Sequence, residues 1–292
     1  MLRSVLWPLA IMAVIHRSYV LVANRWITDD FAPVYRAAVH FKLGRDIYDE
    51  NFTWVDPHYL YPPGGTLVMA PFGYLPEEAS RNWFIFFNTV AIVLAGYFLL
   101  RLFNFTLASV AAPALLLAMF CTENVTNTLV FGNINGVILL FEVLFLRWLL
   151  DGNRSHEWWA GVSIGLTLVV KPLLAPLLLL PLVNRQWRAL VTAFAVPLVF
   201  NVVAWPLIND PMSFVSRTVP YIFSTRDYFN SSILVGPDGV EIGRFRKIHL
   251  PGYSEPRPEH PFQNLEKRYF DVGDLGFNTW RAFDGTVGMC LC

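Results

Sequence analysis

Two adjacent carboxylates, Asp29 and Asp30, are the residues of this chain whose types and position best suit chemistry. They follow the first apolar segment, residues 5–23, and open a polar loop covering residues 24–80. Carboxylates at the mouth of a membrane helix are costly to hold near lipid, which favours a functional role. One would act as a general base on an acceptor hydroxyl, while the other orients it or binds a metal or a phosphate-bound cation. The alternative is a solvated helix end.

Charged residues further along the chain are candidates for substrate binding. Lys171 interrupts the apolar stretch 166–180 and precedes Pro172. An ammonium group there either meets an anionic lipid phosphate or extends to the membrane interface. Arg226 and Asp227 follow a Ser-Thr pair and either contact a phosphate or sugar or form a surface ion pair of little energy.

Polar and aromatic side chains near the expected helix ends complete the candidate set. Glu123, Asn133 and Asn135 lie at helix mouths, where they either contact substrate or cap the helices. Tyr61 belongs to the run Tyr-Leu-Tyr-Pro-Pro-Gly-Gly at residues 59–65, which places aromatics at interface level beside a rigid turn. Such a run is typical of loops that line a substrate and also of ordinary interfacial connections.

Composition indicates that these residues are carried by membrane helices. Of the 292 residues 55% are hydrophobic and 15% are charged, whereas soluble domains carry about 25% charged residues. The net charge is zero, which gives no support for nucleic-acid binding. The three cysteines show neither metal-ligand nor disulfide-framework spacing.

The apolar runs predict an all-α polytopic membrane domain over residues 1–233. Spans of about 20 residues are expected near residues 5–23, 83–102, 107–121, 134–150, 158–170, 173–183 and 190–208. If the helices alternate and the chain turns back at Lys171-Pro172, one side carries all of the short arginine-bearing loops, those with Arg3, Arg101, Arg147/Arg154 and Arg185/Arg188, and that side is then cytoplasmic. The loop 24–80, the connection 123–133, Lys171 and the segment 209–232 then share the external face.

Local patterns predict further elements inside and after this domain. Residues 31–43 have apolar residues at helical spacing, and Gly44 is a natural stop for such a helix. From residue 234 on the chain is more charged and contains no spanning run, which marks a second region, residues 234–292. There, residues 233–235 and 240–242 flank Pro-Asp-Gly and predict a β-hairpin.

The motifs of the first region resemble a known family. They are Thr-Asp-Asp-Phe at 28–31, Tyr-Arg-Ala at 35–37, Tyr-Leu-Tyr-Pro-Pro-Gly at 59–64, Gly-Asn-Ile-Asn at 132–135 and Lys-Pro at 171–172. Together they resemble the polyprenyl-phosphate-dependent membrane glycosyltransferases of the C superfamily, and among these the mycobacterial and corynebacterial arabinofuranosyltransferases of arabinan branching.

That resemblance implies a donor, an acceptor and a base. The donor would be decaprenyl-phosphoryl arabinofuranose, the acceptor cell-wall arabinan extended by α-1,3 branching, and the site would face outward from a multi-pass plasma-membrane protein. Asp30 matches the catalytic base and Asp29 is second. The family often has Gln at the position of Asn133. The resemblance also implies more spans than this chain contains, so we expect a truncated bundle with impaired activity.

The second region resembles an unrelated family. Residues 243–252 and 261–270 are similar to carbon–nitrogen hydrolases of the nitrilase type, with N-carbamoyl-D-amino-acid hydrolases the nearest. That resemblance implies an incomplete α/β fragment of a nitrilase-like sandwich, with Lys247 and Cys292 matching the Lys and Cys of a Glu-Lys-Cys triad. The Glu would lie before the matched stretch, where this chain has membrane helices. We therefore expect a chimeric chain with an inactive hydrolase remnant.

Three functions remain open from the sequence. The first is glycosyl transfer, the second is carbamoyl amide hydrolysis by the tail, and the third is a non-catalytic membrane remnant. The sequence does not decide whether a divalent cation takes part.

Overall fold

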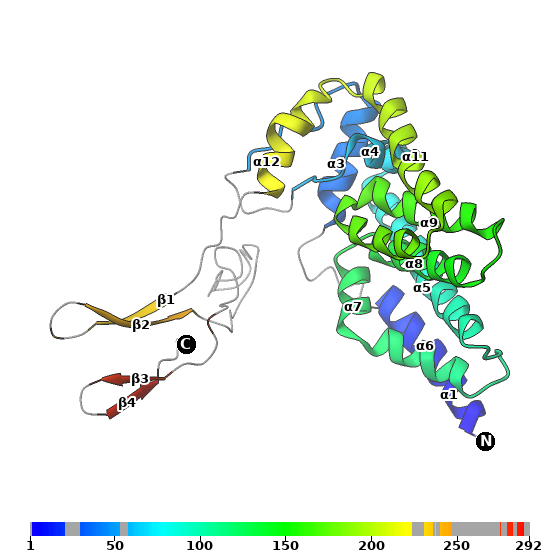
Figure 1. Ribbon diagram of the computed structural model, residues 1–292, viewed down its shortest axis with the longest axis horizontal. Helices are drawn as coiled ribbons and strands as arrows, with labels where there is room; N and C mark the ends of the chain where they lie inside the picture. Colours follow the sequence, from blue (N-terminus) through cyan, green and yellow to red (C-terminus); the bar gives the residue numbers. More distant parts are fainter. Residues whose placement is uncertain are drawn as a thin grey trace. The chain divides into compact units, whose positions relative to one another are not determined.

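A computed structural model of the protein describes residues 2–20, 30–52, 58–223, 231–235, 237, 240–246, 275, 279–282 and 285–288. The chain divides into two compact units (Figure 1). One consists of residues 1–51 and 57–222, and the other of residues 52–56 and 223–292.

The first unit is built from helices. In chain order these are α1 (Leu2–Ile15), the π-helical η1 (His16–Val20), α3 (Phe31–Lys42), α4 (Pro63–Met69), the 3₁₀ turn η2 (Ala70–Tyr74), α5 (Glu77–Leu102), α6 (Ala111–Cys121), α7 (Glu123–Val130), α8 (Asn135–Leu150), α9 (His156–Val170), the 3₁₀ segment η3 (Pro172–Leu178), α10 (Leu179–Val183), α11 (Trp187–Ala204), the 3₁₀ turn η4 (Trp205–Leu207), the π-helical η5 (Phe214–Thr218) and α12 (Val219–Ile222).

Four of these helices form a row in which α5 packs on α8, α8 on α9 and α9 on α11. The contact between α9 and α11 depends on small residues. A Cβ added to Gly161 would lie 2.4 Å from the carbonyl oxygen of Ala189, and one added to Gly165 would lie 2.8 Å from Cβ of Val196. Small residues that let two helix backbones approach are typical of helix pairs within membranes.

The outer surface of the row is apolar. On α11 the side chains of Phe194, Leu198 and Val202 are each more than 60% exposed. Two helical segments, Glu77–Leu102 and Trp187–Leu207, are long and apolar enough to cross a membrane. A continuous apolar surface of this kind is stable against lipid and unfavourable in water.

The loop after the first apolar segment is folded, as the sequence predicts. The buried face of α3 includes Phe31, Val34 and Ala38. The helix ends at Lys42, with Leu43 as its C-cap, and Gly44 follows with a φ of +61°. Glycine adopts this left-handed conformation without steric cost. The predicted helix and its stop are thus confirmed.

Aromatic side chains of this loop belong to the largest buried cluster of the unit. Phe31 contacts Phe84 of α5 with ring centroids 4.9 Å apart, and Tyr48 and Tyr59 are stacked at 6.0 Å. The same cluster takes in the start of α8 and the end of α9 through Ile134 and Val169. The loop is therefore packed onto the ends of the helices that carry the candidate site residues.

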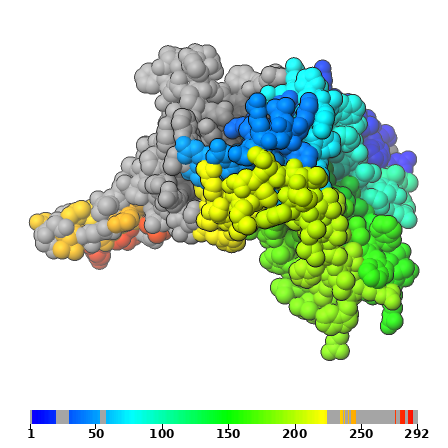
Figure 2. Space-filling model, turned by 90° about the horizontal axis from the view of Figure 1, so that it is seen from above, coloured from blue at the N-terminus to red at the C-terminus, as the bar shows by residue number. Residues whose placement is uncertain are grey.

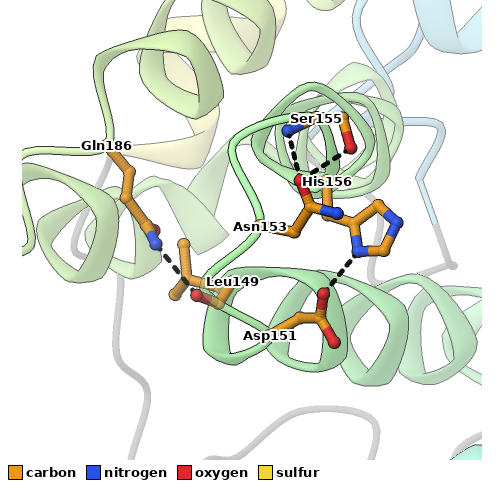
Figure 3. Close-up of polar contacts among 6 residues, drawn as sticks. All are labelled: Leu149, Asp151, Asn153, Ser155, His156 and Gln186. Atoms are coloured by element: carbon orange, nitrogen blue, oxygen red, sulfur yellow. Dashed lines mark hydrogen bonds and ion pairs between the residues drawn. The ribbon is translucent and has the colours of Figure 1, made fainter.

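At the far end of α8 and α9, polar side chains form local contacts and one contact with a distant part of the chain (Figure 3). The amide oxygen of Asn153 accepts hydrogen bonds from the backbone N–H and the hydroxyl of Ser155 at 3.0 and 2.9 Å. Nδ1 of His156 lies 2.6 Å from Oδ2 of Asp151. Gln186 donates to the carbonyl oxygen of Leu149 at 2.9 Å and so joins this turn to the start of α11.

Several predicted elements need correction. The connection 123–133 contains a helix, α7, because Thr122 caps it by accepting the N–H of Val125. The helix predicted over 107–121 begins at Ala111, since residues 103–110 form turns. The break at Lys171-Pro172 is confirmed, with α9 ending at Val170 and a 3₁₀ segment following. Five predicted spans have helices of 5 to 16 residues, so their crossing of a membrane stays a prediction.

The second unit contains two short antiparallel hairpins. Strands β1 (Ser231–Val235) and β2 (Glu241–Arg246) pair with Ser231 opposite Arg246, which confirms the predicted hairpin with longer strands. Strands β3 (Thr279–Ala282) and β4 (Gly285–Gly288) form a second hairpin that the sequence reasoning missed. The described residues of this unit show two two-stranded sheets, so the expected nitrilase-like sandwich is not seen in them.

Candidate active site

Asp30 lies at the start of α3 and faces a residue more than a hundred positions away. It occupies the N-cap position, yet its side chain forms no capping hydrogen bond with α3. Instead its Oδ2 accepts a hydrogen bond of 3.1 Å from Nδ2 of Asn133. A carboxylate is favoured at a helix N-terminus, where the helix dipole is positive. The contact with Asn133 thus directs the Asp30 carboxylate toward the start of α8.

The amides of Asn133 and Asn135 extend this contact to Lys171. Oδ1 of Asn133 accepts the N–H of Asn135 at 3.2 Å, which is a contact of the capping type. Oδ1 of Asn135 accepts from Nζ of Lys171 at 2.5 Å. Both ends of the Asn133 amide are therefore used, with its donor toward the carboxylate and its acceptor toward the helix. The four side chains, which we call the polar chain, join α3, α8 and the break between α9 and η3.

The charges that act on the polar chain are those of its own Asp30 and Lys171 and that of Glu142, a nearby acid on α8. Burial lowers the pKa of Lys171, and the charges of Asp30 and Glu142 oppose that change by raising it. An ammonium next to carboxylates keeps its proton more readily than an isolated buried one. Burial also raises the pKa of Tyr61, and the charge of Asp30 raises it further. Tyr61 is therefore a neutral phenol near Asp30, able to donate a hydrogen bond.

A cavity of about 560 Å³ opens beside the polar chain. Its polar lining includes Asn133, Asn135, Lys171 and Glu142, joined by amide and hydroxyl side chains of α7. The remaining wall is apolar and includes Ile92, Phe131, Ile138, Leu139 and Leu174. An apolar pocket with a few converging polar groups is the usual form of a binding site.

Asn88 of α5 fixes the helix start that carries Asn133 and Asn135. Its side chain is 1% exposed. Its Oδ1 accepts the N–H groups of Gly136 at 3.0 Å and Val137 at 3.3 Å. The two helices meet closely here, because a Cβ at Gly136 would lie 2.8 Å from the carbonyl oxygen of Asn88. Asn88 thus supplies an acceptor that the first turn of α8 needs.

Tyr61 is positioned by a buried group of hydroxyls. The hydroxyl of Thr66, on the fully buried start of α4, bonds to those of Tyr59 at 2.9 Å and Tyr48 at 3.1 Å. Tyr48 also contacts the carbonyl oxygen of Tyr61 at 3.0 Å. The N–H of Gly64 donates to Oδ1 of Asn201 on α11 at 3.0 Å. The sequence around Tyr61 is therefore tied to the helical row.

Ionic and amide contacts join this loop to the segment after α11. Nη1 of Arg217 lies 2.6 Å from Oδ1 of Asp49, and Nδ2 of Asn209 donates to Oδ1 of Asp46 at 2.6 Å. Figure 2 shows these two parts of the chain, coloured blue and yellow, next to each other on the surface. Glu50 contacts the ring of His58 at 2.8 Å and the N–H of Tyr59 at 3.2 Å. The loop is thus held at several points.

The structure brings together some of the predicted site residues and leaves others aside. Asp30, Asn133, Asn135, Lys171 and Tyr61 lie around one centre. Glu123 is exposed at the start of α7, and its neighbour Asn124 lines the cavity instead. The predictions for Asp29, Arg226, Asp227, Lys247 and Cys292 lie outside the described residues. Within the described ranges, no group of three or more His, Cys, Asp or Glu side chains could hold a metal ion.

Sequence reasoning missed two residues of this site, Glu142 and Asn88. Each left a signal, because each is a polar side chain within an apolar helical run, residues 134–150 and 83–102 respectively. An acid or amide inside such a run is expensive and therefore points to a specific partner or a function.

Comparisons with known proteins agree with the sequence motifs. Glycosyltransferase family 87 matches residues 59–237. The chain is 71% identical over 233 residues to an alpha-(1->3)-arabinofuranosyltransferase of Mycolicibacterium smegmatis, covering 80% of this chain and 54% of the relative. It is 45% identical over 232 residues to the protein of that name in Corynebacterium glutamicum, covering 79% of this chain and 55% of the relative. The chain thus spans about half the length of these curated relatives.

A separate similarity concerns the C-terminal part. Over 68 residues, 22% of this chain, it is 32% identical to an N-carbamoylputrescine amidase of Oryza sativa, and covers 19% of that relative.

Proposed function

Because the chain belongs to glycosyltransferase family 87, we propose that it carries the donor and base site of a membrane glycosyltransferase that moves arabinofuranose from decaprenyl phosphate to arabinan. The proposal includes α-1,3 branching, the activity named for its relatives in Mycolicibacterium and Corynebacterium. It also places the chain in the plasma membrane as a multi-pass protein with its site on the external face.

The polar chain is the observation that carries the proposal. It sets a carboxylate, Asp30, and a cation, Lys171, at two ends of a pair of amides. Glycosyl transfer from a lipid phosphate needs a negative charge that acts as the base and a positive charge beside the leaving phosphate. A base must accept the proton of the attacking hydroxyl, and a cation must offset the charge that develops on the leaving phosphate.

The reaction follows from these positions. Asp30 accepts the proton of an acceptor hydroxyl, whose oxygen forms a bond to the anomeric carbon of the donor. The bond from that carbon to the phosphate oxygen breaks, and its electron pair leaves with the phosphate beside Lys171. Tyr61, as a neutral phenol, donates a hydrogen bond to the acceptor or to the Asp30 carboxylate. Asn133 holds Asp30 throughout, so little reorganisation is needed during the reaction.

Transfer from a prenyl-phosphoryl arabinofuranose to a synthetic arabinan tests the proposal. We expect Asp30→Asn to lower kcat by about 10²- to 10⁴-fold, the range for loss of a general base. Asp210→Asn, an exposed acid after η4, is the matched control and should change the rate by less than twofold. If Asp30→Ala transfers as fast as wild type, the base assignment is wrong.

The C-terminal unit has a second candidate activity because of its similarity to an amidase. That similarity covers 19% of the amidase, and the Glu of the triad would lie where this chain is helical. We propose that this unit has no amidase activity. N-carbamoylputrescine should therefore release no ammonia with this protein. Turnover that Cys292→Ser abolishes would contradict this.

A further inference from the structure

Glu142 lies on the cavity-facing side of α8, two turns beyond Asn135. The cavity lining on this helix consists of residues 135, 136, 138, 139 and 142, and positions three, four and seven apart share one face of a helix. Seven residues of helix rise about 10 Å. The cavity therefore extends from the amide of Asn135 to a carboxylate well inside the helix.

The carboxylate of Glu142 has few polar neighbours in the part of the chain that the structure describes. Among the described residues it has no hydrogen bond or ion pair. Within the described ranges, the charge that acts on it is the ammonium of Lys171. An acid two turns inside an apolar helix is unfavourable, and such a residue commonly marks a binding site or a conduction path.

Other groups of the cavity suit a ligand that carries hydroxyls. Asn124, Asn127 and Thr128 of α7 also line the cavity. Amides and hydroxyls both donate and accept, whereas an ionised carboxylate only accepts. A sugar offers the complementary set of several O–H donors and acceptors. The apolar wall formed by Ile92, Ile138 and Leu174 suits the faces of its ring.

The donor sugar fits this cavity better than the acceptor does. Lys171 and Asn133 line the cavity, whereas the lining residues do not include Asp30 or Tyr61. Asn133 contacts Asp30 from the cavity side. A phosphate at Lys171 brings the sugar bonded to it into the cavity, and the acceptor hydroxyl reaches the anomeric carbon from Asp30.

We propose that Glu142 is a sugar-binding residue, which accepts a hydrogen bond from a ring hydroxyl of the donor furanose while Lys171 holds its phosphate. This inference rests on the proposed function and adds the residue that recognises the donor's sugar. Lys171 binds the part that all prenyl phosphates share, and Glu142 binds the part that distinguishes a glycosylated lipid from a bare one.

Equilibrium binding separates these two roles. The full chain in lipid nanodiscs is titrated with radiolabelled prenyl-phosphoryl arabinofuranose and, separately, with prenyl phosphate of the same chain length. We expect Glu142→Leu to weaken binding of the sugar-bearing lipid by about 10- to 100-fold, the value of a hydrogen bond to a charged group. Binding of prenyl phosphate should change by less than about threefold. Lys171→Met should weaken both ligands.

Two further variants sharpen the result. Glu142→Gln keeps the shape of the side chain and one acceptor oxygen. Its affinity for the sugar-bearing lipid should therefore lie between those of wild type and Glu142→Leu. Glu77→Gln, the same change at an exposed acid in the first turn of α5, should bind both lipids as wild type does. A donor lacking the contacted ring hydroxyl should bind wild type and Glu142→Leu equally.

Several outcomes would overturn the inference. Unchanged binding of the sugar-bearing lipid to Glu142→Leu would show that no such contact exists. Equal weakening of both lipids would assign Glu142 to the phosphate or to the fold. A wild-type protein that does not prefer the sugar-bearing lipid would exclude sugar recognition here. Failure of the proposed function looks different, because then the donor binds with Glu142-dependent preference and no arabinose is transferred.

Discussion

The two ends of α8 and α9 differ in how their polar side chains are satisfied. At the end with Asn135 and Lys171, side chains bond across 36 to 103 positions in the chain. At the other end the pairs of side chains, Asn153 with Ser155 and Asp151 with His156, span two and five positions, and one side chain, Gln186, reaches a backbone carbonyl 37 positions away. Local pairs of the second kind shape a turn. Long-range pairs of the first kind depend on the whole bundle, and they surround the cavity.

The functional end of this helical unit is the one with long-range contacts between polar side chains. The turn at the other end is shaped mainly by contacts between its own residues, with one bond from Gln186 to the backbone, so its polar side chains are readily replaced. The site end holds a carboxylate, an ammonium and several amides in one place, at the cost of desolvating them. Such an arrangement is maintained for what it does, since apolar packing would stabilise the bundle as well.

After the loss of the Asp30 base, the largest effect on transfer should come from removing the cation of the polar chain. Lys171→Met should lower transfer by about 100-fold, because a leaving phosphate then lacks its counter-charge, which corresponds to about 2.7 kcal/mol. The pKa of Lys171 is lowered by burial, so wild-type transfer should fall on the alkaline side at a pH below the ordinary lysine pKa.

A pH–rate profile checks the direction in which the pKa of Lys171 is shifted. Because Glu142 raises the pKa of Lys171, Glu142→Gln should move the alkaline fall to lower pH. An alkaline fall that stays in place in Lys171→Met would assign it to another group. Arg188→Met, at the opposite end of the bundle, is the control and should leave the profile unchanged.

A smaller effect, on the stability of the protein, is expected where Asn88 of α5 caps the start of α8. Asn88→Ala removes the acceptor for the N–H groups of Gly136 and Val137, and a buried donor left unpaired costs about 1–3 kcal/mol. Thermal unfolding in detergent measures the loss.

The neighbouring residue gives the matched control. The hydroxyl of Thr89 donates to the carbonyl oxygen of Ile85 in its own helix at 2.9 Å, so Thr89→Ala should cost much less. Equal losses for the two variants would show that Asn88 contributes by packing alone. Transfer should also slow in Asn88→Ala, because the start of α8 carries Asn133 and Asn135.

The smallest effects on stability are expected from removing exposed polar contacts, one at each end of the bundle. Arg217→Ala breaks a long-range contact with Asp49, whose side chain is 72% exposed, and should cost at most about 1 kcal/mol. His156→Ala breaks a local pair and should stay within about 0.5 kcal/mol. Transfer should weaken only in Arg217→Ala, since Arg217 holds the loop that carries Tyr61. If His156→Ala slows transfer as much, the contrast between the two ends fails.

Several parts of the fold followed from local patterns. The helix over residues 31–42 and its stop at Gly44 were predictable because helical spacing and a residue tolerant of positive φ act over a few positions. The break at Lys171-Pro172 and the hairpin around Pro237 were predictable for the same reason. Helix α7 was missed because a short polar helix looks like a loop until its cap, Thr122, is recognised.

The site was predictable only in part. Asp30, Lys171, Asn133 and Asn135 attracted attention because charged and amide groups are costly near lipid. Which of them meet, and in what order, depends on how α3, α8 and α9 pack. Glu142 escaped notice because it sits within an apolar run, and the cavity that it lines exists only in the folded chain.

The sequence by itself determined the chemical inventory of this protein and the family to which it belongs. Apolar runs, a polar loop with two carboxylates and a lysine before a proline are properties of short segments, where each residue's cost or preference acts alone. The tertiary structure decided the pairing of Asp30 with Asn133, the support of α8 by Asn88 and the placing of Glu142 in a cavity. Those contacts exist only after residues far apart in the chain pack together.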